Sequence, residues 1–151
     1  MSNFSLYTKK VMEHFKKPHN YGRIKNPDGI GKVGNMTCGD VMHLYIKVGK
    51  NKKNEEIIKD IKFETFGCVA AISTSSVITD LAQGRTLDKA LKISAKEVIS
   101  ALGDLPSIKK HCSLLAVDAL NEAIYNYLSK NKKEISKELE EKHKKLKKHE
   151  H

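Results

Sequence analysis

The 151-residue sequence has no tryptophan, only three prolines and only three cysteines. No apolar run approaches the roughly 20 residues that a transmembrane helix requires, and no basic start followed by an apolar segment marks a signal peptide. We therefore expect a cytoplasmic protein that does not associate with membranes. Disulfides are disfavoured in that reducing compartment, so the three thiols are available for metal binding, catalysis or packing.

Support for nucleotide binding and zinc proteolysis is also missing, since the sequence contains no GxxxxGKS, GxxxxGKT or HExxH pattern, and the glycines of segment 29–34 follow no predicted strand. The net charge of +10 is compatible with a nucleic-acid partner. However, residues 130–151 carry +4 of it, and the rest is spread thinly with no basic stripe interleaved with aromatics. We interpret the charge as solvated surface, and a basic nucleic-acid-binding module with structural cysteines is the less favoured alternative.

The amino-terminal half predicts one helix, a loop and a strand hairpin. Apolar residues four apart predict a helix over residues 5–15. Proline and glycine are dense over residues 18–34, which predicts a loop in which the glycines provide flexibility. Alternating apolar residues predict strands over residues 41–48 and 57–66, and the short connection between them favours an antiparallel hairpin.

The carboxy-terminal half predicts helices. A segment rich in small residues over 69–83 is followed by Gly84, a residue typical of helix ends. Ser94 and Glu97 form a capping-box pattern that begins a helix ending at Gly103. A long amphipathic helix begins near His111, and its apolar stripe consists of Leu114, Val117, Leu120, Ile124 and Leu128.

This order of elements, with strands followed by a run of helices, predicts an α+β fold with a small antiparallel sheet packed by helices. The length supports a single domain, which we place at residues 1–129. Residues 130–151 form a Lys- and Glu-rich tail, in which Ile135, Leu139 and Leu146 are too few for a firm apolar stripe. We expect this tail to be helical or frayed, and solvated.

The three cysteines fall at the ends of predicted elements. Cys38 precedes the first predicted strand, Cys68 lies between a strand and a helix, and Cys112 begins the long helix. Residues at element ends can converge on one surface site, although a lone cysteine is as often a small buried apolar residue. Asp40 follows Cys38 after one glycine, and His111 directly precedes Cys112.

Three thiols, one imidazole and one carboxylate can complete a tetrahedral zinc site or hold an iron–sulfur cluster. Cys68 and Cys112 each stand next to a predicted helix N-terminus, where the helix dipole favours the thiolate. The remaining histidines are interpreted as structural or solvated: His14, His19, His43, His143, His149 and His151.

From residue 7 to about residue 127 the sequence resembles the iron–sulfur cluster assembly scaffold family, IscU and the N-terminal domain of NifU. Four ordered motifs carry the resemblance: YTKKVMEHFKKPHNYG, CGDVMHLYIKV, FETFGCVAAISTSS and LPSIKKHCSLLAVDAL. The resemblance implies cluster ligands at Cys38, Cys68 and Cys112, a fourth ligand at His111 and an assembly-and-release role for Asp40. It also implies an α+β fold with about three antiparallel strands.

The function implied by the resemblance is that of a scaffold, not an enzyme. A [2Fe-2S] cluster would be assembled on it from iron and sulfide and then transferred to apo iron–sulfur acceptor proteins. A cysteine desulfurase would supply sulfur, and an electron donor such as a ferredoxin would supply electrons. Zn²⁺ could occupy the site when no cluster is bound. Whether the protein is a monomer or a homodimer is left open. The alternative is a zinc-bound sulfur acceptor like SufU, which His111 and the compact segment between Cys68 and Cys112 disfavour.

Overall fold

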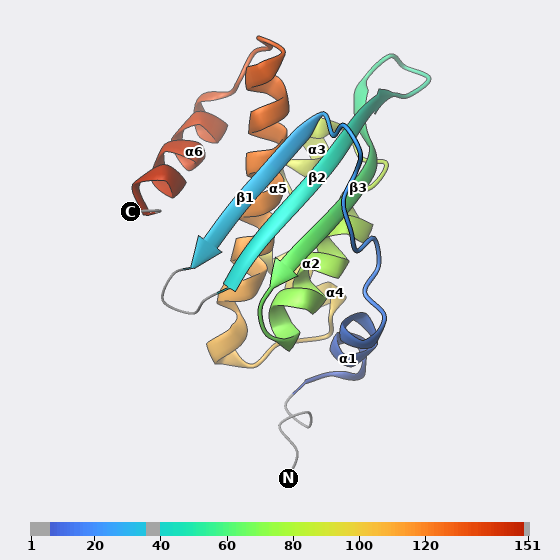
Figure 1. Ribbon diagram of the computed structural model, residues 1–151, viewed down its shortest axis with the longest axis vertical. Helices are drawn as coiled ribbons and strands as arrows, with labels where there is room; N and C mark the ends of the chain where they lie inside the picture. Colours follow the sequence, from blue (N-terminus) through green and yellow to red (C-terminus); the bar gives the residue numbers. More distant parts are fainter. Residues whose placement is uncertain (1–6, 36–39, 150–151) are drawn as a thin grey trace.

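A three-stranded antiparallel sheet packed by helices forms the centre of the molecule (Figure 1). The computed structural model describes residues 7–35 and 40–149. The strands are β1 (Gly29–Asn35), β2 (Asp40–Lys50) and β3 (Glu56–Phe66), in the order β1-β2-β3. The predicted α+β class and three-stranded sheet are confirmed.

The helices lie mainly on one side of the sheet. They are α1 (Lys9–Lys16), α2 (Val69–Ala82), α3 (Leu87–Ala90), α4 (Ala95–Ala101), the 3₁₀ turn η2 (Ser107–Lys109), α5 (His111–Lys130) and α6 (Lys137–His149). Helix α5 packs against β1 and β2, α2 packs against β3, and α1 contacts α2 (Figure 1). Within residues 7–35 and 40–149, no helix combines the length and apolarity needed to cross a bilayer.

The first strand corrects the expectation of a loop over residues 18–34. Gly29 and Gly31 belong to β1 and lie directly against the backbone of α5. A Cβ added to Gly31 would come within 2.0 Å of the Ala119 carbonyl oxygen, and one added to Gly29 within 2.3 Å of that of Ala123. The glycines therefore permit close contact between a strand and a helix, and the interpretation of flexibility was wrong.

The predicted hairpin of β2 and β3 is confirmed, with one shift in the pattern of buried residues. The register shifts between Lys47 and Val48, where Lys59 of β3 forms a bulge. Beyond a bulge, the alternation of faces changes by one residue. Ile58 is therefore fully buried, whereas Ile57, which strict alternation with the buried Ile61 and Phe63 would place inside, is half-buried.

The helix ends that were predicted from nearby capping residues are confirmed. Gly84 and Gly103 follow α2 and α4 with φ of +85° and +87°. The Ser94 hydroxyl accepts a hydrogen bond from the Glu97 backbone N–H at the start of α4. Leu114 of the predicted stripe in α5 is instead 55% exposed, because it borders an open pocket between the α3–α4 connection, α5 and α6.

Helix α6 packs its few apolar residues against α5 and the core. Leu139 is only 3% exposed, and Ile135 and Leu146 are partly buried. His143 of α6 also pairs with the buried Glu122 of α5 at 2.7 Å. The tail is thus helical and less solvated than expected, while the division between a core domain and a tail stays a prediction.

Candidate metal centre

Two of the three cysteines stand at helix starts at the end of the sheet where β3 finishes. Cys68 follows β3 after one glycine and is the N-cap residue of α2. His111 and Cys112 are the first two residues of α5, which continues directly from η2. The strand-to-helix connection and the start of α5 thus position three of the predicted site residues.

The three side chains form one compact group. The Sγ atoms of Cys68 and Cys112 lie 4.0 Å apart, about twice the length of a disulfide bond, so the two residues are separate thiols. The Sγ atom of Cys112 lies 3.6 Å from Nε2 of His111. Two thiolates on one tetrahedral metal lie about 3.8 Å apart when each bond is near 2.3 Å, so these separations suit a shared ion.

The backbone around His111 determines which ring nitrogen can bind a metal. Its Nδ1 lies 3.1 Å from the carbonyl oxygen of Ile108. Since a carbonyl oxygen can only accept, Nδ1–H is the donor, and the lone pair of Nε2 is left on the side of Cys112. Metal-ligating histidines are commonly held in this way by a second hydrogen bond.

A lysine and a tyrosine border the two sulfurs. The Cys68 thiolate attracts the Lys109 ammonium, and this attraction is the main cause that raises the pKa of Lys109. Burial raises the pKa of Tyr7, and the negative charge of Cys68 adds to this effect. Lys109 and the N-terminus of α2 both place positive potential beside Cys68, which favours its nucleophilic, metal-binding form.

The other two predicted site residues are described only in part. Cys38 lies outside the described residues, and of Asp40 only the backbone, at the start of β2, is described. In the sheet register Val41 lies opposite Phe66, so the start of β2 lies beside the segment that leads to Cys68. The structure thus brings Cys68, His111 and Cys112 together, and the roles of Cys38 and Asp40 stay predictions.

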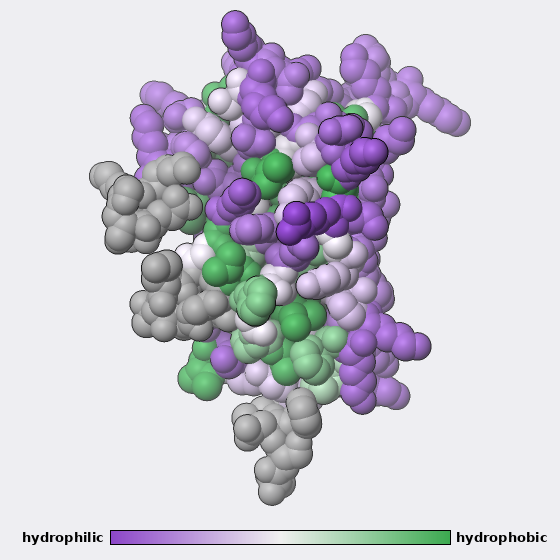
Figure 2. Space-filling view, in the orientation of Figure 1, coloured by the Kyte–Doolittle hydropathy of each residue, from purple (hydrophilic) through white to green (hydrophobic). Residues whose placement is uncertain are grey.

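Exposed apolar side chains lie at this end of the molecule, and no pattern in the sequence predicted them. Phe66 is 84% exposed, and Ile108 of η2 is 78% exposed. The hydrophobic surface in Figure 2 gathers over the same end of the sheet, below a mostly hydrophilic upper half. Lys109 was also missed, and its only signal in the sequence is its position two residues before His111.

The fold and this group of thiols and imidazole define a small α+β protein with a candidate metal-binding centre at one end of its sheet. Residues 6–134 match the family described as the NifU-like N terminal domain, and the chain belongs to this family. This confirms the resemblance drawn from the four motifs.

Two similar proteins are both named as iron-sulfur cluster assembly scaffold proteins. The chain is 53% identical over 128 residues to the iron-sulfur cluster assembly scaffold protein IscU 1 of Archaeoglobus fulgidus, a match that covers 85% of this chain and 80% of the relative. It is 41% identical over 124 residues to the iron-sulfur cluster assembly scaffold protein IscU of Aquifex aeolicus, covering 82% and 77%.

A solved structure supports the fold. The N-terminal NifU-like protein from Brucella abortus superposes with a TM-score of 0.62, covering 84% of this chain and 97% of that one. Its sequence is 19% identical to this chain, so the likeness concerns the fold alone.

Proposed function

We propose that this protein is a scaffold on which an iron–sulfur cluster is assembled and from which it is passed to other proteins. The observation that carries the proposal is the 4.0 Å separation of the Cys68 and Cys112 sulfurs, with the His111 imidazole 3.6 Å from one of them. This is the donor set and spacing that iron shared between thiolates requires. The names of the two relatives support the same function.

The cargo is a [2Fe-2S] cluster held by Cys38, Cys68 and Cys112, with His111 as an exchangeable ligand. A thiolate of the site attacks the outer sulfur of a desulfurase persulfide, so one S–S bond forms, another breaks and the desulfurase thiolate leaves. Two sulfurs delivered in this way need four electrons to become sulfide. Two ferrous ions that become ferric supply two of them, and an electron donor such as a ferredoxin supplies the other two.

Asp40 is proposed to keep the cluster labile. A carboxylate is a harder and more easily replaced iron ligand than a thiolate, so a site that includes one can release what an all-thiolate site would retain. Asp40 is the first residue of β2, beside the segment that leads to Cys68, and this position of its backbone supports the role.

The proposed partners follow from this chemistry. They are a cysteine desulfurase, an electron donor such as a ferredoxin and apo iron–sulfur acceptor proteins, and we place all of them in the cytoplasm. The scaffold holds and transfers its cargo and does not turn over a substrate by itself. Residues 1–129 form the scaffold domain of this proposal, and a homodimer that shares one cluster is compatible with it.

Anaerobic reconstitution tests the proposal. The full chain is incubated with ferrous iron, cysteine and a cysteine desulfurase, and visible absorption, iron and acid-labile sulfide are measured. We expect a chromophore with equal amounts of iron and sulfide, and its loss in Cys68→Ser and in Cys112→Ser. His111→Gln should shorten the lifetime of the cluster, whereas His43→Gln, which removes an imidazole from β2 opposite Glu64, should not.

A second outcome distinguishes the rival function. The same donor atoms suit Zn²⁺, and a zinc-bound sulfur acceptor would take up persulfide sulfur on a cysteine without accumulating iron and sulfide. A protein that holds stoichiometric zinc, accepts sulfur and never develops the chromophore contradicts the scaffold function. Nucleic-acid binding that survives replacement of the cysteines and weakens steeply with salt would instead favour the basic binding module.

A further inference from the structure

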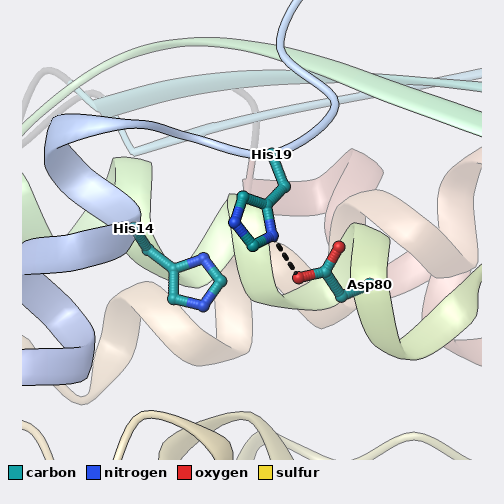
Figure 3. A group of neighbouring side chains, drawn as sticks. All are labelled: His14, His19 and Asp80. Carbon is teal, nitrogen blue, oxygen red and sulfur yellow. Dashed lines mark hydrogen bonds and ion pairs between the residues drawn. The ribbon is translucent and has the colours of Figure 1, made fainter.

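A second group of potential metal ligands lies between α1, the loop that follows it and α2. His14 of α1, His19 of the loop and Asp80 of α2 each offer one ligand atom, and these atoms lie within 4.8 Å of one another. The two imidazole rings are neighbours, with centroids 4.6 Å apart and planes tilted by 53°, and the Asp80 carboxylate lies beyond the His19 ring (Figure 3). From the sequence, both histidines were expected to be structural or solvated.

Neighbouring polar groups already orient these three side chains. Nδ1 of His14 lies 2.7 Å from the Ser76 hydroxyl, which also accepts a hydrogen bond from the His19 backbone N–H at 2.8 Å. Nδ1 of His19 lies 2.6 Å from one Asp80 oxygen, and the Asn20 amide donates to the other at 3.4 Å. When Nδ1–H of His14 donates to Ser76, the lone pair of its Nε2 can bind a metal. Histidine metal ligands commonly donate their other ring N–H to a neighbouring acceptor in this way.

We propose that His14, His19 and Asp80 bind one divalent transition-metal ion of the zinc class. Two imidazoles and one carboxylate form the ligand set that zinc accepts with water in the fourth position, and imidazole disfavours Mg²⁺ and Ca²⁺. Ligand atoms about 2.0–2.1 Å from a tetrahedral ion lie about 3.4 Å apart, so the most separated pair needs to approach by no more than about 1.4 Å. His14 is half-buried, whereas His19 and Asp80 are exposed, so rotation of the latter two can provide this movement.

This site is separate from the cysteine site. Cys68 precedes the first turn of α2 and Asp80 lies in its last turn, 12 residues later. At 1.5 Å per residue the two positions are about 18 Å apart along the helix. A bound ion would therefore fasten α1 and the following loop to α2 without touching the cluster ligands.

The ordinary alternative is that the three residues only form a hydrogen-bonded tether. The His19–Asp80 pair and the contacts to Ser76 would hold the loop on α2 without any ion. The two interpretations differ in one measurable property, which is the number of zinc ions that the folded chain binds.

Isothermal titration with Zn²⁺ measures that number. The titration uses the full chain carrying His149→Gln and His151→Gln, because two terminal imidazoles can bind zinc in any chain. We expect two ions per chain, one at the cysteines and one at the proposed site. Cys68→Ser combined with Cys112→Ser should leave one ion, whose X-ray absorption spectrum shows nitrogen and oxygen ligands without sulfur.

Variants of the proposed ligands complete the test. Asp80→Asn keeps the shape of the side chain and should weaken the remaining site at least tenfold, and His19→Gln, made with the cysteines intact, should reduce two ions to one. His43→Gln is the matched control and should change neither number. If zinc binding is unchanged in Asp80→Asn and His19→Gln, or if replacing the cysteines abolishes all of it, the inference is wrong and the scaffold function is untouched. If binding is lost only in Asp80→Asn and His19→Gln, this site stands and the cysteine site fails.

Discussion

Replacement of Gly31 by alanine tests the close contact between β1 and α5. The added Cβ would lie 2.0 Å from the Ala119 carbonyl oxygen and 2.7 Å from the Ala123 backbone nitrogen. Both atoms belong to the backbone of a 20-residue helix, so they cannot rotate away as a side chain can. Either β1 separates from α5, which exposes apolar surface, or the strand bends, and overpacking of this kind costs about 3 kcal/mol.

Urea denaturation followed by circular dichroism measures this cost. With a slope of about 2 kcal/mol/M, a loss of about 3 kcal/mol lowers the unfolding midpoint by about 1.5 M. Gly49→Ala in β2 is the matched control, because its Cβ would meet only the flexible Lys59 side chain at 3.2 Å. We expect the control to remain within about 0.5 kcal/mol of the parent. Equal midpoints for Gly31→Ala and Gly49→Ala would refute the argument that β1 requires a glycine there.

Four further changes have expected outcomes. Burial raises the pKa of Asp118 to about 6, above its unfolded value of 3.8. The folded state therefore holds the proton more tightly than the unfolded state, and the stability that this contributes is complete below pH 4 and is lost as the pH rises through about 6. Asp118→Asn should therefore be more stable than the parent by about 1–2 kcal/mol at pH 7.5, with the difference vanishing at pH 4 in urea titrations. Thr8→Ala removes the hydroxyl that accepts from the Val11 N–H and donates to the Leu102 carbonyl oxygen, and should cost about 1–2 kcal/mol in the same assay; an unchanged midpoint would contradict the capping role. Asp40→Ala should make a reconstituted cluster longer-lived and slow its transfer, and faster loss of the cluster would leave Asp40 as an ordinary ligand. Truncation after Ser129 removes the packing of Leu139 and the partner of buried Glu122, so it should lower the unfolding midpoint but preserve reconstitution; failure to fold would place the domain boundary further along the chain.

Elements with local signals could be predicted from the sequence. The β2–β3 hairpin follows from alternation along each strand, and the end of α2 follows from Gly84, whose φ of +85° suits a residue without a Cβ. The strand β1 could not be predicted in this way, because its glycines acquire their meaning only from α5, about 90 residues later in the chain. The bulge at Lys59 likewise depends on the pairing of two strands, so the buried position moved from Ile57 to Ile58.

In the candidate site, too, features with local sequence signals could be predicted, whereas contacts between distant segments could not. The ends of elements predicted that Cys68 and Cys112 could meet, and the structure places their sulfurs 4.0 Å apart. The roles of Lys109 and Tyr7 depend on where η2 and the segment before α1 pass the sulfurs, and no spacing in the sequence encodes that path. The grouping of His14 and His19 with Asp80 has no local signal either, because Asp80 lies 61 residues beyond His19.

Helix α2 is the element that connects both candidate sites, and its composition explains how it can do so. It packs between α1 and α5, and its buried residues include several hydroxyls. Each of these needs a partner: Ser75 donates to the Ala71 carbonyl oxygen within the helix, and Ser73 donates to the Val11 carbonyl oxygen of α1. The small side chains of α2 let the neighbouring helices pack closely against it. The hydrogen bond from Ser73 to α1 then fixes how α1 lies on α2. Cys68 at one end of α2 and Asp80 near the other are therefore held at a fixed separation, and α5 and α1 bring Cys112 and His14 beside them.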